Sequence, residues 1–183
     1  SITEPFRQAD YGTLPPLQRI AARDSTPLAF RSYLPDGPAR GSVVLAHGSS
    51  ADSRSMHVLA QALAQAGLMT YALDMRGHGG SGRKGQIDHV GQLEEDLEDF
   101  MRIVEPPRPR TLAGFSAGGG FALRIAGSPR QMLFDRYLLL APFLSQDAPT
   151  YRPDSGGWVR VGIPRIVGLS LLNALGIHAL DGL

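Results

Sequence analysis

The chain has 183 residues, 43% of them hydrophobic, and a formal net charge of +1, which suffices for one domain with a sizeable core. The near-neutral charge, with no basic run, gives no reason to expect nucleic acid as a partner. Cysteine is absent, which excludes disulfides, thiolate metal sites and a cysteine nucleophile. No segment is apolar over the ~20 residues that a transmembrane helix needs.

The first expected elements are short strands. Apolar runs at 17–22 and 28–34, separated by the turn residues 24–27, predict a leading β-hairpin. A Pro-Asp-Gly-Pro turn at 35–38 follows, and the β-branched run 42–46 predicts a buried strand. The chain therefore opens with β structure before its first helix.

The first expected helix follows a capping residue, either Asp52 or Ser53, and ends at Gly67. We assign His57 to the surface of this helix. Helical spacing predicts its buried face: Met56, Leu59, Ala60, Leu63 and Ala64. The apolar run 68–73 that follows predicts another strand.

The next expected helix is amphipathic and spans 90–104, and prolines at 106 and 107 end it. Its buried face comprises Val90, Leu93, Leu97, Phe100, Met101 and Val104. A solvated helix face, rather than a cation site, is expected for most of its acidic residues: Glu94, Glu95, Asp96, Glu98 and Asp99.

A strand at 111–113, a helix at 119–126 and a strand at 137–140 continue the alternation. This order predicts an α/β fold with a mostly parallel sheet and helices on both faces. In such sheets the ligand site lies beyond the carboxyl ends of the strands. Residues that follow a strand should therefore meet in space: Ser49, Asp74, Ser116 and Phe143.

The strongest local signal is the pentapeptide 114–118, Gly-Phe-Ser-Ala-Gly, between an expected strand and an expected helix. This layout is typical of a nucleophile elbow, a sharp turn that lifts a serine hydroxyl above the sheet. Gly114 and Gly118 are needed because a Cβ there would collide with the neighbouring strand and helix. We therefore expect Ser116 to have a positive φ and its Oγ to face a pocket.

Two further motifs follow expected strands: His47-Gly48-Ser49-Ser50, and an Asp-x-Arg-Gly-His-Gly-x-Ser run at 74–81. Together with the pentapeptide, in this order and at these separations, they resemble the α/β-hydrolase superfamily. The resemblance is to its lysophospholipase and monoacylglycerol-lipase-like branch and spans about residues 20–145. It implies an α/β-hydrolase fold.

The resemblance also implies roles for these residues. Ser116 would be the acyl-accepting nucleophile, and the backbone N–H groups of Ser49 and Ala117 would form the oxyanion hole. His47, with Gly48, would shape the loop under that hole rather than act in catalysis.

A second polar group follows the strand at 68–73. Asp74, Arg76 and His78 are a possible reactive cluster, but we expect them to hydrogen-bond and ion-pair within their own loop. A metal site built from the histidines at 47, 57, 78 and 89 lacks convincing ligand spacing, so we expect neither metal nor cofactor.

The far end of the chain departs from the family pattern, which continues through two more strands that carry the triad acid and histidine. Residues 1–145 would form the N-terminal part of the hydrolase core and 146–183 part of a cap, although a helix packing on the core would read the same way. We expect the C-terminal strands and two triad residues to lie outside these 183 residues. Asp147 and His178 keep the required order and are held in reserve as triad partners.

The sequence thus predicts a serine hydrolase of carboxylic esters, with lipid-like monoesters favoured as small-molecule substrates. The alternatives are a related acyltransferase or peptidase, and a silent member that binds an acyl ligand or a partner. Substrate and oligomeric state stay open. Cytoplasmic is the first expectation for the compartment. The compartment nevertheless stays open, because a chain that begins at Ser1 is compatible with a removed leader.

Overall fold

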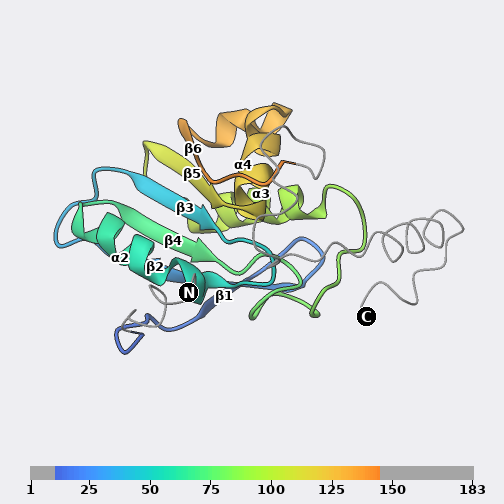
Figure 1. Ribbon diagram of the computed structural model, residues 1–183, viewed down its shortest axis with the longest axis horizontal. Coiled ribbons are helices and arrows are strands. Elements are labelled where there is room, and N and C mark those ends of the chain that lie inside the picture. The colour runs from blue at the N-terminus through green and yellow to red at the C-terminus, as the bar shows by residue number, and fades with distance from the viewer. Residues whose placement is uncertain (1–10, 145–183) are drawn as a thin grey trace, which may run out of the picture. The chain divides into compact units, whose positions relative to one another are not determined.

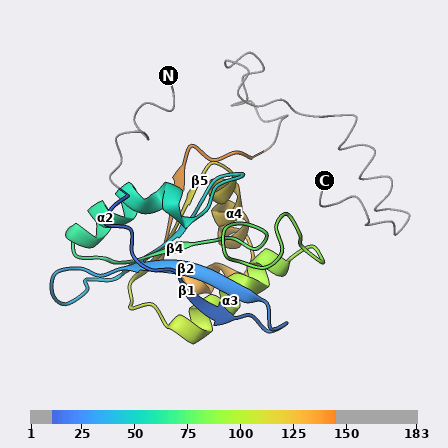
Figure 2. The same cartoon turned by 90° about the horizontal axis from the view of Figure 1, so that it is seen from below.

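The computed structural model describes residues 11–144, in which helices cover both faces of a six-stranded sheet (Figures 1 and 2). The strands are β1 (Gln18–Ala21), β2 (Pro27–Tyr33), β3 (Ser42–Ala46), β4 (Met69–Leu73), β5 (Arg110–Phe115) and β6 (Arg136–Leu140). The helices are α2 (His57–Gln65), α3 (Gln92–Val104) and α4 (Ala117–Ala126), with 3-10 turns η1 (Ser53–Met56) and η2 (Pro129–Leu133).

The strand order across the sheet is β1-β2-β4-β3-β5-β6. β1 and β2 form the expected hairpin, and β2 pairs antiparallel with β4. The remaining pairs, β4 with β3, β3 with β5 and β5 with β6, are parallel. The predicted α/β fold with a mostly parallel sheet is therefore confirmed.

β3 shows why the central strands are mostly apolar. Its side chains alternate between the two faces of the sheet, and both faces are covered by helices. Val44 and Ala46 join the cluster under α3 and α4, whereas Val43 and Leu45 join the cluster under α2. The one polar side chain of this strand, Ser42 at its start, is buried as well, and its hydroxyl donates to the Pro107 carbonyl at 2.7 Å.

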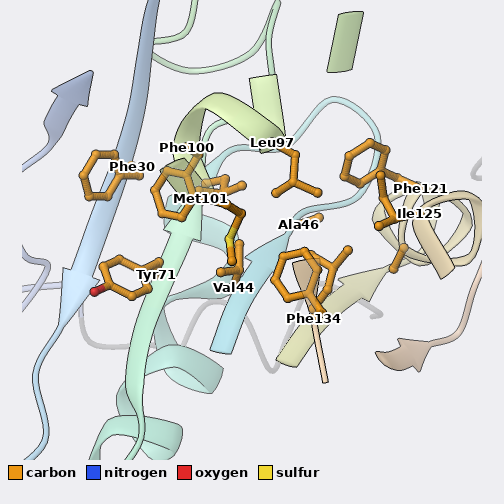
Figure 3. Close-up of a cluster of buried hydrophobic side chains, with 13 residues drawn as sticks. Phe30, Val44, Ala46, Tyr71, Leu97, Phe100, Met101, Phe121, Ile125 and Phe134 are labelled. Atoms are coloured by element: carbon orange, nitrogen blue, oxygen red, sulfur yellow. The ribbon is translucent and has the colours of Figure 1, made fainter. Parts of the chain in front are cut away.

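The larger cluster fills the face under α3 and α4 (Figure 3). Leu97, Phe100 and Met101 come from α3, and Phe121 and Ile125 come from α4. On the opposite face, the predicted stripe of α2 packs against the sheet, with Gly67 in the left-handed region at φ 86° just after the helix. Helices therefore pack on both faces of the central strands.

The start of α3 differs from the expectation. The helix begins at Gln92, after Gly91 in the left-handed region at φ 96°, and Val90 before it is fully exposed. Val90 has helical spacing relative to Leu93 and Leu97, but the chain turns at Gly91 before the helical stripe starts. The inclusion of Val90 in the buried face was wrong.

The acidic face of α3 is also less solvated than expected. Asp96 and Asp99 are buried, at 8% and 3% exposure. Asp96 pairs with Arg76 at 2.7 Å, and Asp99 pairs with Arg23 at 3.1 Å. Arginines from distant loops therefore draw these two carboxylates inside, which a single helix pattern cannot reveal.

His57 was assigned to the surface, and this was wrong, because only 1% of it is exposed. The Tyr33 hydroxyl lies 3.0 Å from its Nδ1, and the Thr13 hydroxyl lies 3.3 Å from its Nε2. Both partners come from segments more than twenty residues away, and their hydroxyl groups take the place of water as hydrogen-bond partners of the two ring nitrogens.

Among the described residues, 11–143 form one compact unit. The expected cap at 146–183, with Asp147 and His178, lies outside the described residues, so the predicted domain boundary stays a prediction. Within residues 11–144, no helix is long and apolar enough to cross a membrane.

Candidate active site

The carboxyl ends of the parallel strands lie side by side. The pairs Ala46 with Gly114, and Phe115 with Leu140, are in register at the ends of β3, β5 and β6. β4 is in register with β3 on its other side. The loops that follow these strands therefore meet at one edge of the sheet, as expected from the sequence.

Ser116 stands at the apex of the turn between β5 and α4. Its φ is 53° and its ψ is −115°, so the predicted positive φ is confirmed. A non-glycine residue in such a conformation costs about 1–3 kcal/mol and persists only when its surroundings impose it. Here the Ser116 N–H donates to the Leu140 carbonyl at 3.0 Å, and the Ser116 carbonyl accepts from the Phe143 N–H at 2.9 Å.

The two glycines of the pentapeptide let the backbone pack closely at this turn. A Cβ on Gly114 would lie 1.9 Å from the Gly118 carbonyl oxygen. A Cβ on Gly118 would lie 2.3 Å from the Ala46 carbonyl oxygen and 2.6 Å from that of His47. Since real Cβ atoms are never found so close, the first turn of α4 reaches β3 and β5 only because both side chains are missing.

The loop after β3 lies directly against the serine. A Cβ on Gly48 would sit 3.3 Å from the Ser116 Cβ, and Ser49 is the next residue along the chain. Within the described chain, neither the Ser49 amide nor the Ala117 amide donates to another protein group. The Ala117 amide is one of the free donors at the start of a ten-residue helix. That both amides point at one space near Ser116 Oγ stays a prediction.

Hydrogen bonds at both ring nitrogens hold His47, in the loop after β3, in its neutral form. The Met75 N–H donates to its Nε2 at 3.0 Å, so Nε2 carries no proton, and Nδ1–H donates to the Gly48 carbonyl at 2.7 Å. Burial lowers the pKa of His47 below its ordinary value. A neutral ring with both nitrogens engaged cannot take the Ser116 proton, which agrees with a loop-shaping residue rather than a base.

Asp74 connects three segments through its carboxylate. Its Oδ1 accepts from the Ser53 N–H and its Oδ2 from the Gly80 N–H, both at 2.7 Å. A Cβ on Gly79, which has φ 52°, would lie 2.1 Å from Oδ2. The carboxylate is therefore occupied by two backbone donors, one from its own loop, as expected, and one from the start of η1, outside that loop.

Ser81 has a role that the sequence analysis did not assign, although it belongs to the motif at 74–81. Its Oγ donates to the Asp74 carbonyl and accepts from the Ala29 N–H, both at 2.7 Å, and it is fully buried. The hydroxyl thus joins the loop to β2. In the sequence, only the presence of an Asp at the start of the motif and a Ser at its end could have indicated this role.

Arg76 is buried at 6% exposure between two carboxylates. It meets Asp96 with two bonds of 2.7 Å and Asp24 with bonds of 2.8 and 3.1 Å. Its hydrogen bonds hold the pKa of Asp24 well below the usual range. Arg76 therefore ties this loop to the hairpin turn and to α3, and the expectation that it would ion-pair within its own loop was wrong.

His78 completes the loop, with its ring 5.0 Å from that of His47 and Nδ1 3.2 Å from the Arg76 carbonyl oxygen. In residues 11–144 no group of three or more His, Asp or Glu side chains is placed to hold a metal ion. None of the histidines in this range hydrogen-bonds to Ser116, and His178 lies outside it.

Comparisons with known proteins agree with this fold. An α/β hydrolase from Penicillium sp. sh18 superposes with a TM-score of 0.68 at 17% identity, covering 92% of this chain and 55% of that one. By its fold the protein is an α/β hydrolase. The profile of the family described as serine aminopeptidase, S33, matches residues 37–176, and the chain belongs to this family.

Two curated relatives are monoacylglycerol lipases by name. The one from Mycolicibacterium smegmatis is 42% identical over 99 residues, which cover 51% of this chain and 35% of the relative. The monoglyceride lipase of Rattus norvegicus is 24% identical over 161 residues, covering 86% of this chain and 51% of the relative. The chain therefore spans about a third to a half of the length of these relatives, and its monoacylglycerol-lipase-like character is established at the level of sequence similarity.

Proposed function

We propose that this protein is a serine hydrolase that cleaves carboxylic esters through an acyl-Ser116 intermediate. The observation that carries the proposal is the conformation of Ser116, held with positive φ where a strand, a helix and the Gly48 loop meet. Backbone strain of this kind is found mainly at functional sites, and ligands bind at the carboxyl edge of parallel sheets, so a strained serine at this edge suits a nucleophile.

In the proposed reaction, Ser116 Oγ attacks the ester carbonyl carbon and passes its proton to a histidine. The Ala117 and Ser49 N–H groups donate to the oxyanion that forms, and loss of one such donor typically costs about 3 kcal/mol of transition-state stabilisation. The alcohol then leaves with the proton, and water attacks the acyl-serine by the same route in reverse. The histidine and its acid come from outside residues 11–144, with His178 and Asp147 as reserve candidates.

Lipid-like monoesters are the proposed substrates. The support is the names of the two curated relatives, together with the apolar side chains beside the serine: Phe115 and Phe143 are about half exposed, at 43% and 48%. Apolar surface next to a nucleophile suits an acyl chain.

The alternatives remain distinct. A peptidase or acyltransferase would use the same serine, and the family description names an aminopeptidase. A silent member would bind an acyl ligand or a partner without forming an acyl-serine.

Labelling by a fluorophosphonate probe tests the proposal. The full protein should be labelled, and Ser116→Ala should lose labelling and p-nitrophenyl ester turnover while its thermal unfolding stays nearly unchanged. Ser55→Ala, which alters an exposed serine in η1, is the matched control and should keep both. An alanine variant at 116 that keeps most of its activity would show that another residue is the nucleophile.

A substrate panel then separates the remaining classes. Turnover of monoacylglycerols of increasing chain length, with little turnover of aminoacyl nitroanilides, is the expected pattern. The reverse preference would favour the peptidase, and labelling without turnover of either would favour a different acyl acceptor.

A further inference from the structure

A nine-residue surface segment, 82–90, between β4 and α3 is exposed along its whole length. Val90 is 100% exposed, more than any other large apolar side chain that the structure describes, and Ile87 is 54% exposed. Single apolar residues on a surface need no explanation, but these two lie within four residues of each other in one loop.

The segment is held in place although its side chains are not buried. The Gly85 N–H donates to the Gly77 carbonyl at 2.8 Å. Gln92 then accepts from the Asp88 N–H at 2.6 Å and donates back to the Asp88 carboxylate at 3.1 Å. The apolar side chains are therefore presented by an anchored loop rather than by a loose one.

The charges of the segment are mainly basic. Arg83 and Lys84 are exposed and form no ion pair with any residue in 11–144. Of the other two titratable residues, Asp88 is turned back to Gln92 and His89 lies 3.2 Å from Glu95. Each cation near an anionic lipid surface contributes about 1 kcal/mol of attraction, and exposed apolar side chains add area that can enter the interface, so the two features act in the same direction.

The location of the segment supports the same partner. It follows β4 after the loop 74–81 and extends beyond the arrowheads of β3 and β4, at the carboxyl edge of the sheet (Figure 1). The loop 74–81 that precedes it contacts the loop under the serine through the rings of His78 and His47, and the segment is bonded to that preceding loop through Gly85 and Gly77. A surface that bound here would place lipid at the same edge of the sheet as the nucleophile.

We propose that segment 82–90 docks the protein onto the surface of anionic phospholipid membranes. Ile87 and Val90 enter the interface between headgroups and acyl chains, while Arg83 and Lys84 pair with lipid phosphates. The proposal concerns binding to the membrane, so it does not depend on the chemistry of Ser116.

Vesicle sedimentation tests it. The full protein should bind vesicles of phosphatidylglycerol and phosphatidylcholine, and bind vesicles of phosphatidylcholine alone much more weakly. Lys84→Gln should lower the partition coefficient about fivefold, and Val90→Asp by at least as much. The matched controls Arg136→Gln and Leu34→Asp lie at the opposite edge of the sheet, at the start of β6 and after β2, and should bind like the unaltered protein.

Lys84 is the only lysine in the sequence, so a lysine-specific protease gives a second readout. Anionic vesicles should protect the Lys84–Gly85 bond from cleavage. Absence of vesicle binding, equal binding by Val90→Asp, or Ile87 and Val90 buried between two copies in solution would each overturn the proposal. Fluorophosphonate labelling of the same variants should not change, which separates this outcome from a failure of the proposed chemistry.

Discussion

The pentapeptide around Ser116 and the loop at 74–81 lie at the same edge of the sheet, but they are held in place mainly by different means, although Gly79 in the loop also leaves no room for a Cβ. The first depends on missing side chains, since Gly114 and Gly118 let backbone approach backbone. The second depends on buried charged side chains, since Asp74 and Arg76 accept and donate at nearly every polar atom. One edge therefore combines steric and polar constraint.

The difference predicts opposite sensitivities. The turn at Ser116 should fail when atoms are added, because a carbonyl oxygen already occupies the space of a Cβ. The loop at 74–81 should fail when a partner is removed, because a buried charge is then left alone. Four experiments can break or sharpen this comparison.

The largest effect is expected for Gly114→Ala. The new Cβ would meet the Gly118 carbonyl oxygen at 1.9 Å, so either β5 or α4 must move, and the free energy of unfolding should fall by about 4 kcal/mol or more. Gly127→Ala is the control, since its nearest neighbour is 3.6 Å away and its φ is −93°. Urea unfolding of both variants measures the contrast, and equal stability would contradict the steric account.

Arg76→Met should cost about 3 kcal/mol of unfolding free energy, because it keeps the volume but leaves Asp96 buried without a partner. Arg102→Met removes an arginine that is 66% exposed and should cost less than about 1 kcal/mol. Pairing Arg76→Met with Asp96→Asn should recover part of the loss. If Arg76→Met alone is harmless, the loop is not held by its charges.

Asp74→Asn should cost about 1–3 kcal/mol, since one acceptor oxygen becomes an NH2 group that faces a backbone N–H. Because the Ser53 N–H is one of those donors, the loop under the serine should loosen and ester turnover should fall further than stability alone explains. The exposed Asp36→Asn is the control. Unchanged kcat/KM in Asp74→Asn would remove Asp74 from the support of the site.

The smallest effect is expected from pH through His47. Burial lowers its folded pKa below the ordinary 6.5, so the unfolded chain binds the proton more readily. Its contribution to stability is therefore complete above pH 6.5 and is lost as the pH falls toward the folded pKa. Urea unfolding of the protein and of His47→Gln between about pH 7.5 and 5 should show a steeper decline for the unaltered protein. Parallel declines would mean that His47 is not held neutral.

Most of the fold could be predicted because each strand and helix carries a local pattern. The hairpin, the run at 42–46 and the helix that Gly67 ends all appeared where expected. The turn at Ser116 was equally local, since two glycines around a serine between a strand and a helix leave little choice of backbone.

The partners of the polar residues could not be predicted. Asp96 and His57 were assigned to solvated faces, but Arg76 and Tyr33 reach them from segments more than fifteen residues away. Sequence periodicity describes one element at a time, and a buried charge or imidazole is defined by what a second element brings to it.

The sequence alone therefore determined the order of strands along the chain, the apolar faces of the helices and the position of the serine turn, because these depend on neighbours within about ten residues. Only the tertiary structure decided that β4 lies between β2 and β3, that His47 is neutral with both nitrogens engaged, and that Arg76 is enclosed by two carboxylates. Each of these needs two or three loops to meet at one edge of the sheet, and their meeting is fixed by packing over the whole core rather than by any local pattern.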